Sequence, residues 1–193
     1  GRQTAGPVRG FGRLWDKRYR LRLEGSPLEP REIVALWRAE FAGFWPEGNR
    51  FFPAGGAPIV PGTVAVLNLA LPGGLVVATG LRVIYADADS FAFMSTQGHI
   101  ISGWITFSCF RESGAVIVQV HPLFRASDPL MEAGFRLGAA KQEDEFWHRT
   151  LGSLARRLGA RGEVEQIDTL ADPRVRWEEA GNLWLSAAVR SSF

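Results

Sequence analysis

Cysteine is nearly absent from this sequence, since Cys109 is the only one in 193 residues. A single cysteine cannot form an internal disulfide and cannot by itself build a zinc site. The histidines are few as well: His99, His121 and His148 show neither the HxH nor the HExxH spacing of metal ligands, so no metal is predicted. The glycine-rich residues 55–62 lack the Lys-Ser/Thr pair of a phosphate-binding loop, and no cofactor is predicted.

A strong excess of charge is also missing. Twenty-two basic residues stand against twenty acidic ones, and a formal net charge of +2 argues against a protein that coats nucleic acid. The charge is uneven, because residues 1–25 hold seven basic and two acidic residues, a net +5, which leaves −3 for the remainder. We interpret residues 1–16 as a basic, solvated N-terminal arm, with contact to phosphate, RNA or anionic lipid as the alternative. No nucleic-acid partner is expected.

No apolar run is both long and unbroken. The most apolar window, residues 64–81, contains Asn68, Thr79 and the break Pro72-Gly73-Gly74, which would leave backbone groups unpaired in lipid. It predicts two strands joined by a turn and no membrane span. Residues 1–16 lack the apolar core of a secretory signal, although a first residue other than Met leaves a removed leader open. With 46% hydrophobic and 22% charged residues the chain resembles an ordinary globular protein, expected in the cytoplasm.

Short apolar segments separated by turn residues fill the middle of the chain. Such a succession predicts an antiparallel meander. An earlier segment alternates Tyr19, Leu21 and Leu23 with three arginines, which is the pattern of a half-buried strand. The predicted strands are residues 18–23, 63–71, 75–85, 91–96, 103–112 and 115–121; a helix is predicted over residues 30–44 and a loop over residues 47–62.

One hairpin of this meander can be tested against its own sequence. If Ser113-Gly114 is a two-residue turn, Thr106 lies opposite His121 and Phe110 opposite Ile117. One face of the hairpin is then apolar throughout and the other is largely polar, which fixes the register. The residues on the apolar face, expected to point inward, are Ile105, Phe107, Cys109, Val116, Val118 and Val120.

A long helix follows, with Asp128 as its N-cap and Pro129 at the first helical position. Over residues 128–158 it would reach roughly 45 Å at about 1.5 Å per residue. Gly134 and Gly138 lie four residues apart and allow a bend or a close approach to the sheet. The apolar stripe at helical spacing is Ala133, Leu137, Ala140, Trp147, Leu151, Leu154 and Leu158.

This order of elements predicts an α+β protein with a helix-grip fold, in which a curved antiparallel β-sheet wraps around a long C-terminal helix. Such a sheet often leaves an apolar cavity between itself and the helix. The alternative is a plain α+β layer packing with a filled core. The predicted organisation is the arm at residues 1–16, the helix-grip domain at residues 17–160 and a packed C-terminal extension at residues 161–193.

The layout over residues 15–159 resembles the SRPBCC superfamily, which includes START lipid-transfer domains, polyketide cyclases and pollen-allergen-like proteins. Gly98-His99 at a strand end, the run from Gly103 to Phe107, the valine strand and the long helix are similar to an uncharacterised bacterial family, a domain of unknown function. The resemblance implies binding of an apolar small molecule, sometimes with chemistry on it.

Four polar or reactive residues are weighed for a role in such a cavity. His99 and His121 would lie towards one end of the sheet, as a pocket rim or an acid–base pair, or else His121 faces solvent and His99 caps a turn. Asp144 falls within the helix stripe, where it would orient a ligand or act as a general base, unless it belongs to a wet face with Glu143 and Glu145. Cys109 is interpreted as a small core residue. No catalytic residue is assigned, and the residues predicted to line the ligand site are His99, Phe107, Cys109, Val118, Val120, Ala140, Asp144 and Trp147.

Three functions stay open. The first is binding of an apolar small molecule or lipid-like ligand between the sheet and the C-terminal helix. The second is a cyclase or dehydratase that acts on an aromatic or polyketide-type substrate with His99 or Asp144 as acid–base. The third is a protein-interaction module that uses the basic arm or the C-terminal extension. The sequence names no ligand and leaves the oligomeric state open.

Overall fold

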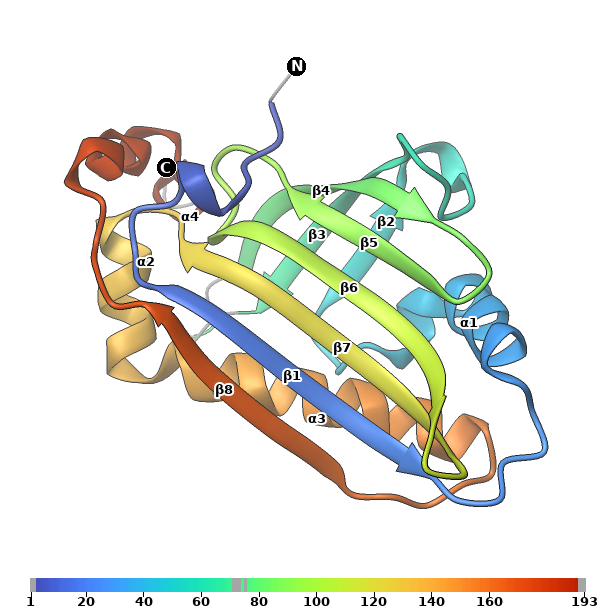
Figure 1. Cartoon of the computed structure of the whole chain (residues 1–193). Coiled ribbons are helices and arrows are strands. Elements are labelled where there is room, and N and C mark those ends of the chain that lie inside the picture. The colour runs from blue at the N-terminus through green and yellow to red at the C-terminus, as the bar shows by residue number, and fades with distance from the viewer. Residues whose placement is uncertain (1–2, 71–73, 75, 191–193) are drawn as a thin grey trace.

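A single antiparallel sheet organises the protein. The computed structural model describes residues 3–70, 74 and 76–190, and within them eight strands pair in the order β2-β3-β4-β5-β6-β7-β1-β8 (Figure 1). The strands are β1 (Leu14–Leu23), β2 (Arg50–Pro53), β3 (Val64–Ala70), β4 (Val76–Ala86), β5 (Ser90–Ser95), β6 (Ile101–Glu112), β7 (Ala115–Ala126) and β8 (Val164–Asp172). The predicted meander is confirmed as β3 to β7, and the turn predicted at Pro72-Gly73-Gly74 lies partly outside the described residues.

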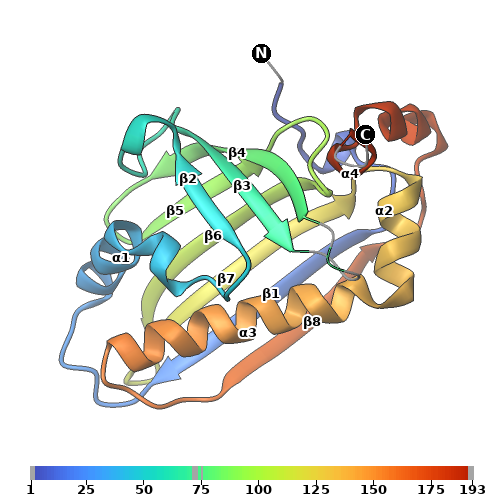
Figure 2. The ribbon, with the colours of Figure 1, turned by 180° about the vertical axis from the view of Figure 1, so that it is seen from behind.

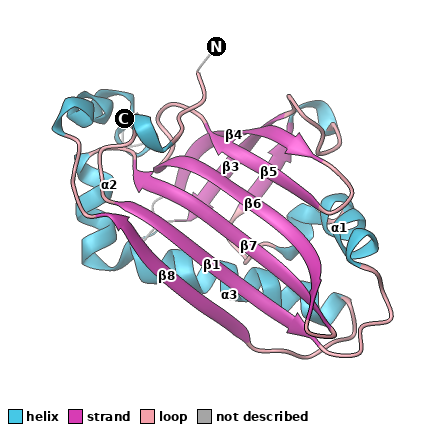
Figure 3. Ribbon diagram, in the orientation of Figure 1, coloured by secondary structure: helices cyan, strands magenta, loops and turns pink. Residues whose placement is uncertain are grey.

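The helices lie on one side of this curved sheet. Figure 2 shows α3 running diagonally across the concave face, with α1 beside it and α2 standing at one end, and Figure 3 shows the same separation of helices and strands. The helices are α1 (Pro30–Ala39), α2 (Pro129–Gly134), α3 (Ala140–Arg157) and the short α4 (Ala187–Arg190). A curved antiparallel sheet around a long C-terminal-side helix is the helix-grip fold that the sequence predicts.

The β6–β7 hairpin has the register expected from its apolar pattern. Thr106 pairs with His121, Phe110 with Ile117, and Glu112 with Ala115. Its apolar face is buried in the core, including Phe107, Cys109, Val118 and Val120. Because side chains alternate between the faces, this register also sends His121 to the outer face.

The alternation predicted for β1 is confirmed, and in the structure it begins two residues earlier, at Lys17. Tyr19, Leu21 and Leu23 are buried on the concave face. Lys17 precedes them by two residues and is buried on the same face, although it was counted as part of a basic segment. A buried ammonium needs a partner, because its desolvation is costly.

The long helix is not continuous. Asp128 caps its N-terminus by accepting a hydrogen bond from the backbone N–H of Met131 at 2.9 Å, as predicted. The chain then passes through a π-helical turn at Phe135–Ala139, where Gly138 has φ of 120°, and continues as α3 in a new direction (Figure 2). Positive φ is available to glycine at little cost, so the bend falls there. The break shifts the helical phase, and the stripe prediction is therefore wrong for Ala133 and Leu137, which are exposed.

Two strands of the sheet, β2 and β8, are not among those predicted from the sequence. The segment interpreted as a loop contains β2, four residues paired with β3. The C-terminal extension contributes β8, an edge strand paired with β1 from Leu14 to Leu21. Neither segment shows a clear alternation, because β2 is very short and β8 is exposed over most of its length.

Both terminal segments pack against the same end of the sheet. The backbone N–H of Ala5 donates to the carbonyl of Ser95 at 2.7 Å, and that of Ala187 to the carbonyl of Gly98 at 2.8 Å. The rings of Phe11 and Trp177 meet edge to face at 5.2 Å. The division into arm, domain and extension stays a prediction, but the described parts of both ends make contacts with the sheet.

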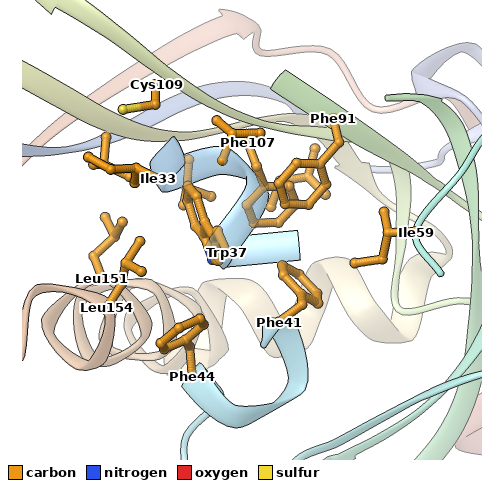
Figure 4. Packing of buried hydrophobic residues seen from close by; sticks show 14 of the residues in the cluster. Ile33, Trp37, Phe41, Phe44, Ile59, Phe91, Phe107, Cys109, Leu151 and Leu154 are labelled. Carbon is orange, nitrogen blue, oxygen red and sulfur yellow. The ribbon is translucent and has the colours of Figure 1, made fainter. Parts of the chain in front are cut away.

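Aromatic rings fill the half of the concave face next to α1 (Figure 4). Phe91 and Phe107 stack with their centroids 4.8 Å apart, and Trp37 of α1 meets Phe107 edge to face at 5.2 Å. Phe41, from the 3₁₀ turn Phe41–Phe44, lies 5.1 Å from Phe107. Leu151 and Leu154 of α3 complete this cluster of buried, closely packed side chains.

Gly103 allows β6 and β7 to approach each other closely. A Cβ there would collide with the carbonyl oxygen of Leu123 and come within 2.7 Å of the Phe124 Cβ. We expect Gly103→Ala to lower the free energy of unfolding by about 2 kcal/mol or more, since packed backbone must move. Gly43→Ala is the matched control, because nothing lies within 4 Å of its Cβ position. Urea denaturation of both variants measures the difference, and equal stabilities would contradict this account.

Candidate functional site

A cavity of about 540 Å³ lies between the concave sheet face and the helices α2 and α3. The aromatic cluster closes one end, because Phe41 and Phe107 belong both to the cluster and to the cavity wall. The opposite end includes Ile100 and Met131, against which α4 packs with Ala187. The apolar wall between these ends is formed by side chains from β3 to β6 and from α3, among them Leu69, Leu81, Phe93, Ile105, Phe146 and Trp147.

The bend between α2 and α3 forms the rim of this cavity. Leu137, in the turn before Gly138, is 88% exposed and lines the cavity from its solvent side. Glu47, Glu145 and Arg149 add charged side chains to the lining. An apolar interior with a partly charged rim is the usual form of a small-molecule site.

One of the residues that line the cavity is a buried histidine, His99. Its side chain lines the cavity, the residue is only 4% exposed, and Nδ1 lies 3.0 Å from the hydroxyl oxygen of Thr79 on β4. Burial lowers the pKa of His99 to about 3, because a charged imidazolium would lose its hydration there. The imidazole is therefore neutral at neutral pH, able to donate or accept a hydrogen bond but not to supply a positive charge.

A cluster of four polar residues joins β1 to the start of α3. The Lys17 ammonium donates to Asp144 Oδ1 at 2.6 Å and to Glu143 Oε2 at 3.1 Å. The Tyr19 hydroxyl donates to the same Asp144 oxygen at 2.6 Å. The side chains of Lys17, Glu143 and Asp144 are 5%, 17% and 24% exposed, so the ion pairs are largely shielded from water. Of the four residues, Glu143 also lines the cavity.

Burial and charge act together on the protonation of this cluster. Burial raises the pKa of Glu143 to about 7, although the Lys17 ammonium opposes the shift. For Lys17 burial lowers the pKa, but the two carboxylates outweigh it and the net pKa is raised. The pKa of Tyr19 is raised by burial and by the nearby carboxylates, so its hydroxyl remains a donor. Near neutral pH the carboxyl group of Glu143 is thus the one poised to gain or lose a proton.

The structure places the eight predicted site residues in two groups. His99, Phe107 and Trp147 line the cavity. Cys109 is a buried core residue, as interpreted, and burial raises the pKa of its thiol to about 12. The residues that are not part of the cavity wall are Cys109, Val118, Val120, Ala140 and Asp144.

The structure decides between the alternatives kept for two polar residues. His121 lies on the outer face, which is the second of its two alternatives, with Nε2 2.9 Å from Asp16 Oδ1, and it forms no acid–base pair with His99 in the cavity. Asp144 neither faces the cavity nor belongs to a wet face, since it accepts from Lys17 and Tyr19. Glu143 lines the cavity in place of Asp144, which keeps the sheet-facing position that the stripe predicts and is bound there by Lys17 and Tyr19.

Glu143 and Lys17 were missed, yet the sequence held a signal for both. Residues 17, 19, 21 and 23 share one face of a strand, so the alternation that places Tyr19 inward places Lys17 inward too. A buried lysine opposite a run of three acids predicts an ion pair.

Neither a metal cluster nor a membrane-spanning helix is found in the described part of the chain. No three or more His, Cys, Asp or Glu side chains are grouped so that they could hold an ion. No helix there combines the length and the apolar character needed to cross a bilayer.

Comparison with known proteins gives structural matches and no sequence match. No protein-family model matches the sequence, and no curated protein matches it. The protein TTHA0849 from Thermus thermophilus superposes with a TM-score of 0.57 at 14% identity, over 74% of this chain and 96% of that one. The ginseng major latex-like protein 151 from Panax ginseng superposes with a TM-score of 0.52 at 12% identity, over 76% of this chain and 98% of that one.

The di-domain ARO/CYC StfQ from the steffimycin biosynthetic pathway gives a TM-score of 0.53 at 9% identity, over 77% of this chain. The match covers 53% of StfQ, so this chain spans about half of that protein. These proteins have SRPBCC-type folds, and the fold expected from the resemblance of the sequence to that superfamily is confirmed. At such low identities the likeness concerns the fold alone.

Removal of the Lys17 ammonium leaves two shielded carboxylates without their cation. We expect Lys17→Met to lower the free energy of unfolding by about 3 kcal/mol at pH 8. The loss of stability shrinks towards pH 4.5. The raised pKa of Glu143 keeps its carboxyl group protonated in the folded variant at low pH, so the cost of a buried, unpaired carboxylate appears only as the pH rises.

Arg18→Met is the matched control for this change. Arg18 is the next residue of β1, faces outward, and meets Asp16 at 3.5 Å in a half-exposed pair. Such a pair contributes less than about 1 kcal/mol. Chemical denaturation at pH 8 and pH 5 compares the two variants, and equal losses would show that Lys17 is not a buried partner.

The neutral state of buried His99 predicts a stability that depends on pH. In the folded protein the pKa of His99 is about 3, below the usual 6.5. The contribution of His99 to the free energy of unfolding is therefore complete above pH 6.5 and is lost as the pH falls towards 3. When the pH falls from 7 to 4, we expect the free energy of unfolding to decrease by about 3 kcal/mol more in the native protein than in the variant His99→Gln. The other two histidines are present in both proteins, so an equal dependence of stability on pH in the native protein and the variant would contradict the buried neutral imidazole.

Proposed function

We propose that this protein binds an apolar small molecule in the cavity between the sheet and α3. The observation that carries the proposal is the cavity of about 540 Å³, whose wall is mostly apolar and whose two ends are closed by packed side chains. This volume lies in the range of about 300–1,000 Å³ that is usual for small-molecule sites. A filled core, the alternative considered from the sequence, would leave no such space.

The energy available to such a ligand is sufficient for useful affinity. A molecule of two or three fused rings that buries about 200 Å² of apolar surface gains roughly 5 kcal/mol by transfer from water. The loss of its freedom opposes this gain, so the final affinity depends on polar contacts with the wall.

A second candidate function is acid–base chemistry on the bound molecule. It is favoured by the neutral imidazole of His99 and the carboxyl group of Glu143, which line the same cavity and titrate far from their usual ranges. The structural likeness to StfQ, described as an ARO/CYC protein, is consistent with this alternative. The two functions differ in whether the bound molecule leaves the protein unchanged.

A bulky residue inside the cavity is expected to prevent binding. Leu69 of β3 lines the cavity, whereas Val66 of the same strand is exposed on the outer face. We expect the native protein to bind the neutral fluorescent probe N-phenyl-1-naphthylamine saturably. Leu69→Trp is expected to weaken binding at least tenfold because the indole occupies the space, and Val66→Trp to leave it unchanged.

Native mass spectrometry of protein purified without detergent extends this test to natural ligands. A retained molecule that keeps its mass after prolonged incubation indicates a carrier, and a changed mass indicates an enzyme. Absence of saturable probe binding, or equal binding by both tryptophan variants, would overturn the proposed function.

A further inference from the structure

The charges around the cavity are predominantly negative. Glu47, Glu143 and Glu145 line it, against Arg149 alone among the basic side chains of the described wall. Arg149 lies 4.0 Å from Glu145 and is directed to the exposed rim. The interior therefore contains a carboxyl group, from Glu143, and no basic side chain of its own.

The Lys17 ammonium does not reverse this balance. It is shared between Glu143 and Asp144, so two carboxylates face one cation, and Asp168 of β8 adds a further negative charge to the surroundings of Glu143. Among the described residues, Lys17 donates to Glu143 Oε2, and no hydrogen bond is made to Oε1. Glu143, a residue of the cavity wall held by a buried lysine, thus keeps one carboxylate oxygen without a hydrogen bond from the described residues.

His99 offers a second polar atom to the same space. Its Nδ1 is engaged with Thr79, and no hydrogen bond to Nε2 is made within the described residues. The fully enclosed side-chain nitrogen atoms without a partner there are Arg20 Nε and the indole nitrogens of Trp37 and Trp45. Nε2 is not one of them, so this atom is not fully enclosed, and the residue that carries it lines the cavity.

We propose that Glu143 makes the cavity selective for apolar molecules that carry a hydrogen-bond donor and no negative charge, with His99 as a second, neutral contact. This inference rests on the proposed binding function and specifies its ligand. A donor such as a hydroxyl or an ammonium group binds the free Glu143 oxygen, whereas an anionic head group meets a net negative wall in a medium where charges are poorly screened. Fatty acids and other carboxylates are therefore excluded despite their apolar bodies.

A series of naphthalenes of nearly equal size tests the inference, each displacing N-phenyl-1-naphthylamine at pH 8. Because the pKa of Glu143 is raised to about 7, its carboxyl group is mostly ionised at this pH. The probes are 2-methylnaphthalene, 2-naphthol, 2-(aminomethyl)naphthalene and 2-naphthoate. We expect naphthol or the amine to bind about tenfold more tightly than methylnaphthalene, and naphthoate at least tenfold more weakly. The tighter of the two donors identifies which group the site prefers.

Glu143→Gln isolates the contribution of the charge. It is expected to reduce the ratio of the affinities for methylnaphthalene and naphthoate about tenfold, and this ratio, rather than either affinity alone, is the quantity compared with the native protein. Glu165→Gln is the control, because Glu165 lies at the outer face of β8 beside Arg20 and also removes one negative charge. Retained binding of the fluorescent probe shows that each variant is folded, and if Glu143→Gln does not fold, the ranking by the native protein decides.

The outcomes separate this inference from the function on which it rests. If neither methylnaphthalene nor the fluorescent probe binds, the proposed function fails and the inference with it. If they bind but naphthoate binds equally well, or neither donor exceeds methylnaphthalene, the inference alone is overturned. An unchanged ratio in Glu143→Gln would likewise assign the selectivity to another group and overturn it.

Discussion

The buried contact between Lys17 of β1 and the two carboxylates at the start of α3 sets the position of the helix on the sheet. Taking three charged groups out of water is costly, and the cost is offset only when the groups meet in good geometry. Lys17 lies within 3.1 Å of both carboxylates, and Tyr19 adds a hydrogen bond to Asp144. Leu151 and Leu154 pack α3 on the sheet through contacts that have no preferred direction, whereas the hydrogen-bonded ion cluster is directional and ties the start of α3 to β1, with Glu143 in the cavity wall.

The cavity follows from how that helix is held at its two ends. Its C-terminal half packs on a sheet face that aromatic rings from α1 and the following turn already cover. Its N-terminal end leaves the sheet at Gly138, where the chain turns into α2. Between the rings and the bend the wall on the sheet side is formed by apolar side chains such as Leu69, Leu81 and Ile105, and α4 packs at the far end. The space is therefore a consequence of helix placement and side-chain size together.

The parts of this structure that the sequence predicted are those in which a pattern acts locally. The β6–β7 register follows from a period of two and a two-residue turn, and both are properties of adjacent residues. The bend at Gly138 depends on a backbone conformation that hydrophobic periodicity does not encode, so the predicted stripe fails before the bend, at Ala133 and Leu137, and holds after it. The edge strand β8 is exposed and pairs with a strand about 150 residues earlier, so neither alternation nor proximity revealed it.

The ion cluster is hard to explain as a device for stability. Buried ion pairs can often be replaced by apolar residues of similar volume without loss, and sometimes with a gain. Apolar side chains at 17, 143 and 144 would pack α3 against the sheet, without the directional contact of the ion cluster, and would spare the desolvation of an ammonium and two carboxylates. They would not place an oxygen acceptor in the wall of an apolar cavity, and they would not keep negatively charged molecules out. The fold, which is shared with proteins of 9–14% identity, provides the scaffold around the cavity, and we infer that residues such as Glu143 determine which molecules bind in it.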